Sequence, residues 1–117
     1  MNITFIGGGN MARALIGGLV ARGSASNAFA VVDPSPDARS TISARFGVAT
    51  FAAIEPPAVA QAEIIVLAVK PQQFRSILEE LKAQIGPQHL VISIAAGIPL
   101  ATMISVLNRV WLASGTV

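Results

Sequence analysis

The sequence has no cysteine, a single histidine and few charged side chains. Of its 117 residues, 12% are charged and 5% are aromatic. The absence of cysteine excludes disulfide frameworks and thiolate zinc sites, and one histidine, His89, argues against a multi-histidine metal site or a serine triad. The 53% of hydrophobic residues supply enough apolar surface to offset chain entropy, so disorder is excluded too. We therefore expect one folded domain without a metal ion.

The positive charges are scattered along the chain. The sequence pI is about 10.0, but the eight Lys and Arg residues leave a formal net charge of only +2 and form no run or stripe. Surfaces that follow the phosphates of nucleic acids need clustered cations. We therefore expect no nucleic-acid partner.

The mean hydropathy of +0.66 raises the question of a membrane span. The best candidate, residues 90–107, is uncharged and about long enough to cross a bilayer. A Gly-Ile-Pro turn at residues 97–99 interrupts it, and its β-branched first half differs from its second half, which has helical spacing. The N-terminus lacks the positive charge of a signal peptide, and Arg13 interrupts the early apolar stretch. We therefore expect a cytoplasmic protein with no membrane segment.

Short β-branched runs alternate with amphipathic segments. We expect strands at residues 3–6, 29–32, 48–51, 64–69 and 90–94. We expect helices at residues 11–22, 37–46, 57–61, 74–85 and 100–107. This alternation predicts an α/β fold of the Rossmann type, a doubly wound parallel sheet with helices on both faces.

Three local features refine this prediction. Asn10 is the expected N-cap of the first helix, and Gly23 is expected to end it. In the helix at 74–85, five apolar residues are expected to face the core, namely Phe74, Ile77, Leu78, Leu81 and Ile85. We interpret His89, in a polar turn before the fifth strand, as structural or solvated.

The strongest chemical signal is a glycine loop between the first strand and the first helix. Gly7 permits a tight turn, Gly9 lets backbone amides approach a pyrophosphate, and Ala12 allows the helix to pack closely on the strand. Amides at the start of a helix, with its partial positive charge, hold such a diphosphate. A glycine turn in a flavodoxin-like domain that binds no dinucleotide is the alternative. The strand–turn–helix setting favours dinucleotide binding.

Residues after the second strand bear on the choice of cofactor. Asp33, 24 residues beyond Gly9, could accept hydrogen bonds from the adenosine ribose, which favours NAD(H). Ser35 and Arg39 could instead reach the 2′-phosphate of NADP(H), although Arg39 also fits a solvated helix face. The residues alone leave both cofactors open.

Three blocks of the sequence resemble pyrroline-5-carboxylate reductases. They are residues 5–19, which begin Phe-Ile-Gly-Gly-Gly-Asn-Met-Ala, residues 68–73, Ala-Val-Lys-Pro-Gln-Gln, and residues 93–98, Ser-Ile-Ala-Ala-Gly-Ile. The resemblance implies hydride transfer from NAD(P)H, with NADP(H) favoured, to the C=N carbon of the small-molecule substrate 1-pyrroline-5-carboxylate. The product is L-proline, which places the reaction in proline biosynthesis. Full-length members form homo-oligomers. Each block alone also fits β-hydroxyacid-type dehydrogenases or F420-dependent NADP reductases.

The resemblance also implies where the cofactor lies. It places the cofactor loop on Ile6, Gly7, Gly8, Gly9, Asn10 and Met11. It places adenosine-side contacts on Ser35 and Asp37. It places the nicotinamide side on Ala68, Val69, Lys70, Pro71, Ala95, Ala96 and Gly97. Lys70 could bond a ribose hydroxyl or be an ordinary surface lysine, and no catalytic residue is assigned.

Two segments depart from the family pattern. Residues 53–57 lack an asparagine that many members place near the cofactor. Residues 109–117 do not match the family's Arg-x-Met-Pro-Asn-Thr-Pro segment. We expect this chain to lack the helical domain that supplies most substrate contacts in the family. We therefore expect an NAD(P)-binding domain at residues 1–108, a divergent tail at 109–117, and no reductase activity from this chain alone. A non-catalytic NAD(P)-binding module is the alternative.

Overall fold

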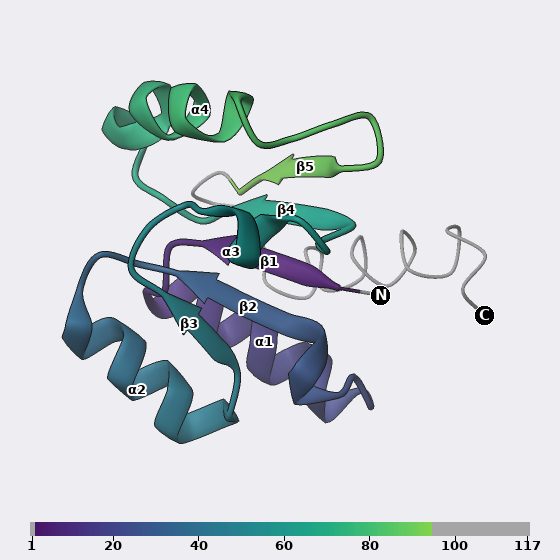
Figure 1. Cartoon of the computed structure of the whole chain (residues 1–117). Helices are drawn as coiled ribbons and strands as arrows, with labels where there is room; N and C mark the ends of the chain where they lie inside the picture. The colour runs from purple at the N-terminus through teal and green to yellow at the C-terminus, as the bar shows by residue number, and fades with distance from the viewer. Residues whose placement is uncertain (1, 95–117) are drawn as a thin grey trace.

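A computed structural model describes residues 2–94 of the chain. Five strands form its sheet, namely β1 (Ile3–Ile6), β2 (Phe29–Val32), β3 (Ala49–Phe51), β4 (Ile64–Leu67) and β5 (Leu90–Ser93). Their order across the sheet is β3-β2-β1-β4-β5, and all neighbours are parallel (Figure 1). This is the strand order of the doubly wound dinucleotide-binding fold. The predicted Rossmann-type α/β fold is confirmed.

Helices connect successive strands in the described part of the chain. They are α1 (Asn10–Ala21), α2 (Pro36–Phe46), α3 (Pro56–Val59) and α4 (Phe74–Lys82), with two short 3-10 helices, η1 (Ser26–Ala28) and η2 (Pro71–Gln73). The expected helix at residues 100–107 and the expected tail at 109–117 lie outside the described residues.

Apolar side chains bury both faces of the sheet. On one face, α1 and α2 cover a cluster that includes Phe5, Leu15, Ile16, Leu19, Val31 and Ile42. On the other face, α3 and α4 cover a cluster that includes Ile6, Val32, Val59, Ile65, Leu67 and Leu81. Successive side chains of a strand point to opposite faces, so a sheet covered on both sides requires the continuous apolar strands seen in the sequence.

The expected N-cap of α1 is wrong. The N-cap is Gly9, and Asn10 is the first residue of the helix. Oδ1 of Asn10 accepts a hydrogen bond from Nη2 of Arg13 instead of capping the helix. The first-turn amides of a helix have no intrahelical acceptor, and no side chain caps those of α1 at the end of the glycine loop.

The helix α4 is shorter, and its buried face narrower, than the sequence suggests. It ends at Lys82, not at residue 85. Leu81 is fully buried and Ile77 packs against the core, but the side chain of Leu78 is 46% exposed, so its expected inward position is wrong. Because α4 packs with residues of β4 and β5 at the border of the sheet, only one stripe of the helix meets the core.

Candidate dinucleotide-binding site

The glycine loop lies where the carboxyl end of β1 meets the ends of two neighbouring strands. The backbone N–H of Gly7 donates to the carbonyl of Val32, at the end of β2 (2.7 Å). Gly7 has a φ of +106°, and a Cβ added there would collide with the carbonyl oxygen of Ala68, directly after β4. A side chain at residue 7 is therefore excluded by both backbone conformation and space.

Gly9 has the opposite surroundings. It is exposed, its backbone is extended, and nothing lies within 4 Å of a Cβ added at this position. The open space at Gly9 adjoins the amides of Asn10 and Met11 in the first turn of α1. Open backbone beside a helix N-terminus is what a diphosphate requires.

Asp33 follows β2 and faces inward, toward the glycine loop. Its Oδ2 accepts a hydrogen bond from the backbone N–H of Gly8 (2.8 Å), and its Oδ1 accepts one from the backbone N–H of Ser35 (2.8 Å). Its own N–H donates to the carbonyl of Phe51 at the end of β3 (2.9 Å). One residue thus connects the glycine loop, the start of α2 and β3.

The start of α2 brings together the residues predicted on the adenosine side. Ser35 is the N-cap, and its Oγ accepts a hydrogen bond from the amide of Ala38 (3.3 Å). Asp37 lies exposed in the first turn. Arg39 is half-buried, and its Nη1 donates to the backbone carbonyl of Asp33 (2.7 Å), so Arg39 folds back over the end of β2 instead of extending into solvent.

The segment predicted on the nicotinamide side follows β4, which ends at Leu67. The amide of Ala68 donates to the carbonyl of Ile6 (2.8 Å), which ties this segment to the end of β1. Lys70 is exposed, and its carbonyl accepts from the amide of Gln73 at the start of α4 (2.9 Å). Ala95, Ala96 and Gly97 lie outside the described residues. The predicted site residues up to Pro71 all come from the carboxyl ends of β1, β2 and β4, the loops that follow these strands, or the first turns of the helices after those loops.

A cavity of about 330 Å³ opens at this edge of the sheet. Its lining includes four positions from the ends and following loops of β1, β2 and β4, namely Ile6, Gly7, Asp33 and Val69. Eight further lining residues were not predicted. Val32 and Pro34 flank Asp33, and the other six are Ala53, Ile54, Gln73, Ser76, Ile77 and Glu80. These six follow β3 or belong to α4 and the turn before it. The β3-β2-β1-β4-β5 strand order is the signal that would have found them. In this parallel sheet the segments that follow β2, β3 and β4 all begin at the same edge as the end of β1.

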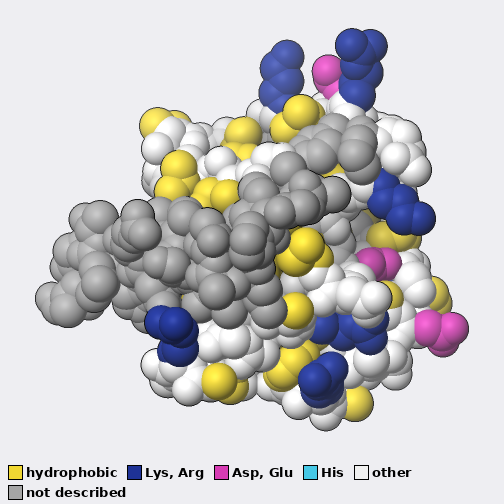
Figure 2. Space-filling view, turned by 180° about the vertical axis from the view of Figure 1, so that it is seen from behind, with side chains coloured by type: hydrophobic (Ala, Val, Ile, Leu, Met, Phe, Trp, Pro, Cys, Tyr) yellow, Lys and Arg dark blue, Asp and Glu magenta, His cyan; other side chains and the backbone are white. Residues whose placement is uncertain are grey.

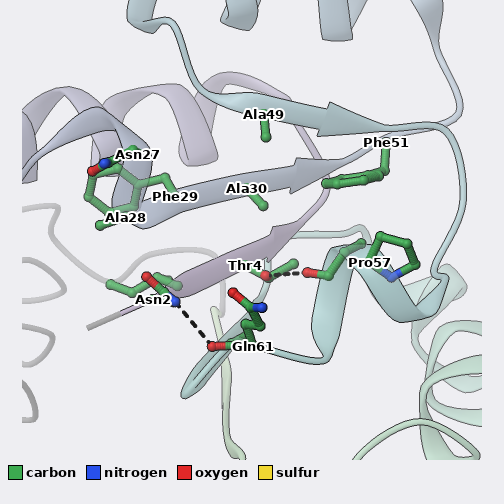
Figure 3. A pocket seen from close by; sticks show the side chains of 13 residues that line it. Asn2, Thr4, Asn27, Ala28, Phe29, Ala30, Ala49, Phe51, Pro57 and Gln61 are labelled. Carbon is green, nitrogen blue, oxygen red and sulfur yellow. Dashed lines mark hydrogen bonds between the residues drawn. The ribbon is translucent and has the colours of Figure 1, made fainter.

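A second cavity of about 200 Å³ involves the opposite, amino ends of β1 and β2 and the helix α3 (Figure 3). Two of its polar side chains are already engaged. The hydroxyl of Thr4 donates to the carbonyl of Ala58 (2.7 Å), and Nδ2 of Asn2 donates to the carbonyl of Gln61 (3.3 Å). None of the described residues that line this cavity is charged. It is therefore not suited to a diphosphate.

The described surface adds three observations. Figure 2 shows dark-blue Lys and Arg side chains spread over the visible face without forming one continuous patch. None of the helices within residues 2–94 has the length and apolarity to cross a membrane. In the same residues, no three His, Asp or Glu side chains gather as a metal site would require.

The strand order, the glycine loop and the open helix start define a dinucleotide-binding domain of the Rossmann type. A family model described as "NADP oxidoreductase coenzyme F420-dependent" matches residues 2–97, and the chain belongs to that family.

The chain is also similar to pyrroline-5-carboxylate reductases, which confirms the predicted resemblance. It is 41% identical over 101 residues to the enzyme of Pseudomonas aeruginosa, covering 86% of this chain and 37% of the relative. It is 42% identical over 100 residues to the enzyme of Escherichia coli K12, covering 84% of this chain and 36% of that relative. The solved structure from Coxiella burnetii matches with a TM-score of 0.73 and 40% identity, covering 88% of this chain and 37% of that one. The chain thus spans little more than a third of these relatives and corresponds to their N-terminal domain.

Proposed function

We propose that this chain is the NAD(P)H-binding domain of a pyrroline-5-carboxylate reductase. The supporting observation is the geometry of the glycine loop. Gly7 packs so closely on the backbone of Ala68 that no side chain fits there, whereas the space around Gly9, next to the first-turn amides of α1, is open. This geometry lies in the region of about 41% identity to the reductases. In the proposed protein the domain acts within a cytoplasmic homo-oligomer.

The residues present fit the cofactor. The amides of Asn10 and Met11 would hold the diphosphate, and the cavity at the carboxyl edge would take the adenosine side. The segment from Ala68 to Pro71 would face the nicotinamide ribose. Bound NAD(P)H supplies a hydride to the C=N carbon of 1-pyrroline-5-carboxylate, and the ring nitrogen takes up a proton to give L-proline. The chain's own contribution is to fix the position of the hydride donor.

The start of α2 supports NADP(H) as the cofactor. A 2′-phosphate there would meet the N-terminus of an 11-residue helix, the Ser35 side chain and the guanidinium of Arg39. Asp33, the residue that would favour NAD(H), has both carboxylate oxygens engaged by backbone amides. We therefore propose that NADPH binds more tightly than NADH.

The substitution Gly9→Asp tests cofactor binding directly. The structure has room for a side chain at residue 9, so the variant is expected to fold, while its carboxylate would occupy the approach of the diphosphate and repel it. We expect saturable NADPH binding by the wild type and a loss of at least about 100-fold in affinity for the variant, since one pair of like charges at close range costs several kcal/mol. Titration of nicotinamide fluorescence measures both.

Gly9→Ala is the matched control for this experiment. It adds the Cβ without the charge, so its affinity should lie between those of the wild type and Gly9→Asp. If Gly9→Asp bound NADPH as well as the wild type does, the loop would not be the diphosphate site and the proposed function would be wrong.

A further inference from the structure

We propose that Asp33 is a positioning residue, which holds the glycine loop and the start of α2 in their binding geometry and does not contact the adenosine ribose. The cofactor part of this proposal rests on the proposed function. The orientation of the carboxylate is a property of the protein alone and is tested separately.

The hydrogen bonds of Asp33 fix the direction of its carboxylate. Oδ2 lies 2.8 Å from the amide nitrogen of Gly8, and Oδ1 lies 2.8 Å from that of Ser35. Gly8 is buried, and a Cβ added to it would lie 3.1 Å from Cγ1 of Val31 and 3.4 Å from Oδ2 of Asp33. The 3.1 Å separation is tighter than an ordinary contact, so a side chain at residue 8 would require Val31 or the loop to move.

Turning this carboxylate outward to a ribose would be unfavourable. The rotation would break two charge-assisted hydrogen bonds and leave the buried N–H of Gly8 without an acceptor. The main chain of Asp33 is also held, because its N–H donates to Phe51 and its carbonyl accepts from Arg39. Backbone and side chain therefore keep the carboxylate facing the loop.

This arrangement has two consequences for the cofactor. The N–H of Gly8 is engaged by Asp33, so a diphosphate takes its hydrogen bonds from the helix amides beyond Gly9. The negative charge of Asp33 is directed at two N–H dipoles, which reduces its repulsion of a 2′-phosphate, and Arg39 adds a positive charge at the backbone carbonyl of the same residue. An acidic residue at the end of β2 is then compatible with NADPH.

The test compares Asp33→Ala and Asp33→Asn with the wild type in the full chain. Asp33→Ala removes both acceptors, and Asp33→Asn keeps one of them. Glu79→Gln, an exposed position on α4 outside the cavity lining, controls for the loss of one negative charge. Two properties are measured, namely the dissociation constants of NADPH and NADH, and the resonance and hydrogen exchange of the Gly8 amide in the ¹⁵N-labelled protein.

We expect Asp33→Ala to weaken NADPH and NADH binding by about tenfold each, because the two charge-assisted hydrogen bonds that position the loop and the start of α2 are both lost. Asp33→Asn should recover part of the loss, and Glu79→Gln should bind as the wild type does. The Gly8 amide should be protected from exchange in the wild type, stay protected when NADH is bound, and lose protection in Asp33→Ala.

Other outcomes overturn the proposal. A ribose contact predicts that Asp33→Ala weakens NADH but strengthens NADPH, because the repulsion of the 2′-phosphate is removed. A Gly8 amide that exchanges freely in the wild type, or that loses its protection when NADH binds, would show that Asp33 does not hold the loop. If the wild type bound neither cofactor, the proposed function would fail, and the Gly8 amide would still decide the orientation of Asp33.

Discussion

Gly7 and Gly9, two residues apart in one loop, are constrained for different reasons. Gly7 has a positive φ and no space for a Cβ beside Ala68, so a substitution there disturbs the contact between β1 and β4. Gly9 has an ordinary extended backbone and open surroundings, so the structure itself does not require glycine at this position. The requirement at Gly9 comes from the proposed ligand, which makes it the more informative position for functional tests.

Arg39→Ala tests the choice of cofactor at the scale of one residue. If the guanidinium of Arg39 binds the 2′-phosphate, the variant should bind NADPH about tenfold more weakly and NADH nearly unchanged, because only NADPH carries that charge. Parallel titrations with the two cofactors measure the difference.

Arg45→Ala is the matched control, since Arg45 lies in the last turn of the same helix with its guanidinium over the ring of Phe46. Arg45→Ala removes one positive charge from α2, as Arg39→Ala does, but at the end of the helix that lies away from the proposed 2′-phosphate site. Equal weakening of NADPH and NADH by Arg39→Ala would mean that Arg39 acts only through its hydrogen bond to Asp33.

At the scale of elements, His89 ties the turn between α4 and β5 to the end of α3. Its Nδ1 accepts from the amide of Gly86 (2.9 Å), so its Nε2 carries the proton and donates to the carbonyl of Val59 (3.0 Å). Of the two interpretations open from the sequence, the structural one is confirmed. This contact joins segments 30 residues apart that share no strand pairing.

We expect His89→Ala to lower the free energy of unfolding by about 2 kcal/mol. The variant leaves the partly buried N–H of Gly86 without its acceptor and removes one of the two hydrogen bonds that the carbonyl of Val59 accepts, the other coming from the amide of Ala62. Urea unfolding followed by circular dichroism measures the change. Gln88→Ala, at the exposed neighbouring position, should change the unfolding free energy by less than about 0.5 kcal/mol. Equal stability of the two variants would contradict a structural role for His89.

At the scale of the whole molecule, cofactor binding should stabilise the folded chain. Binding to the folded state alone at 100 times the dissociation constant contributes about 2.7 kcal/mol. For a domain of this size that raises Tm by about 10 °C. Thermal melts with and without NADPH measure the shift, and Gly9→Asp should melt near the wild-type temperature with no shift on adding NADPH. A shift of equal size in both would place the binding outside the glycine loop.

The sequence predicted most elements because their signals are local. The β-branched runs at 29–32 and 64–67 and the helix of α2, which ends at Gly47, follow from residues next to one another in the chain. The prediction was wrong at Asn10 and Leu78. A capping position depends on where the loop enters the helix, and the burial of Leu78 depends on how much of α4 meets the sheet.

The sequence by itself determined the alternating strands and helices, the Rossmann class and the glycine loop, because periodicity and turn residues act over a few neighbouring positions. The tertiary structure alone decided the direction of the Asp33 carboxylate and the walls of the cavity at the carboxyl edge. Both depend on strand order, which brings Gly8, Asp33 and α4 together from segments far apart in the chain. Such contacts arise from packing between elements, and no local pattern encodes them.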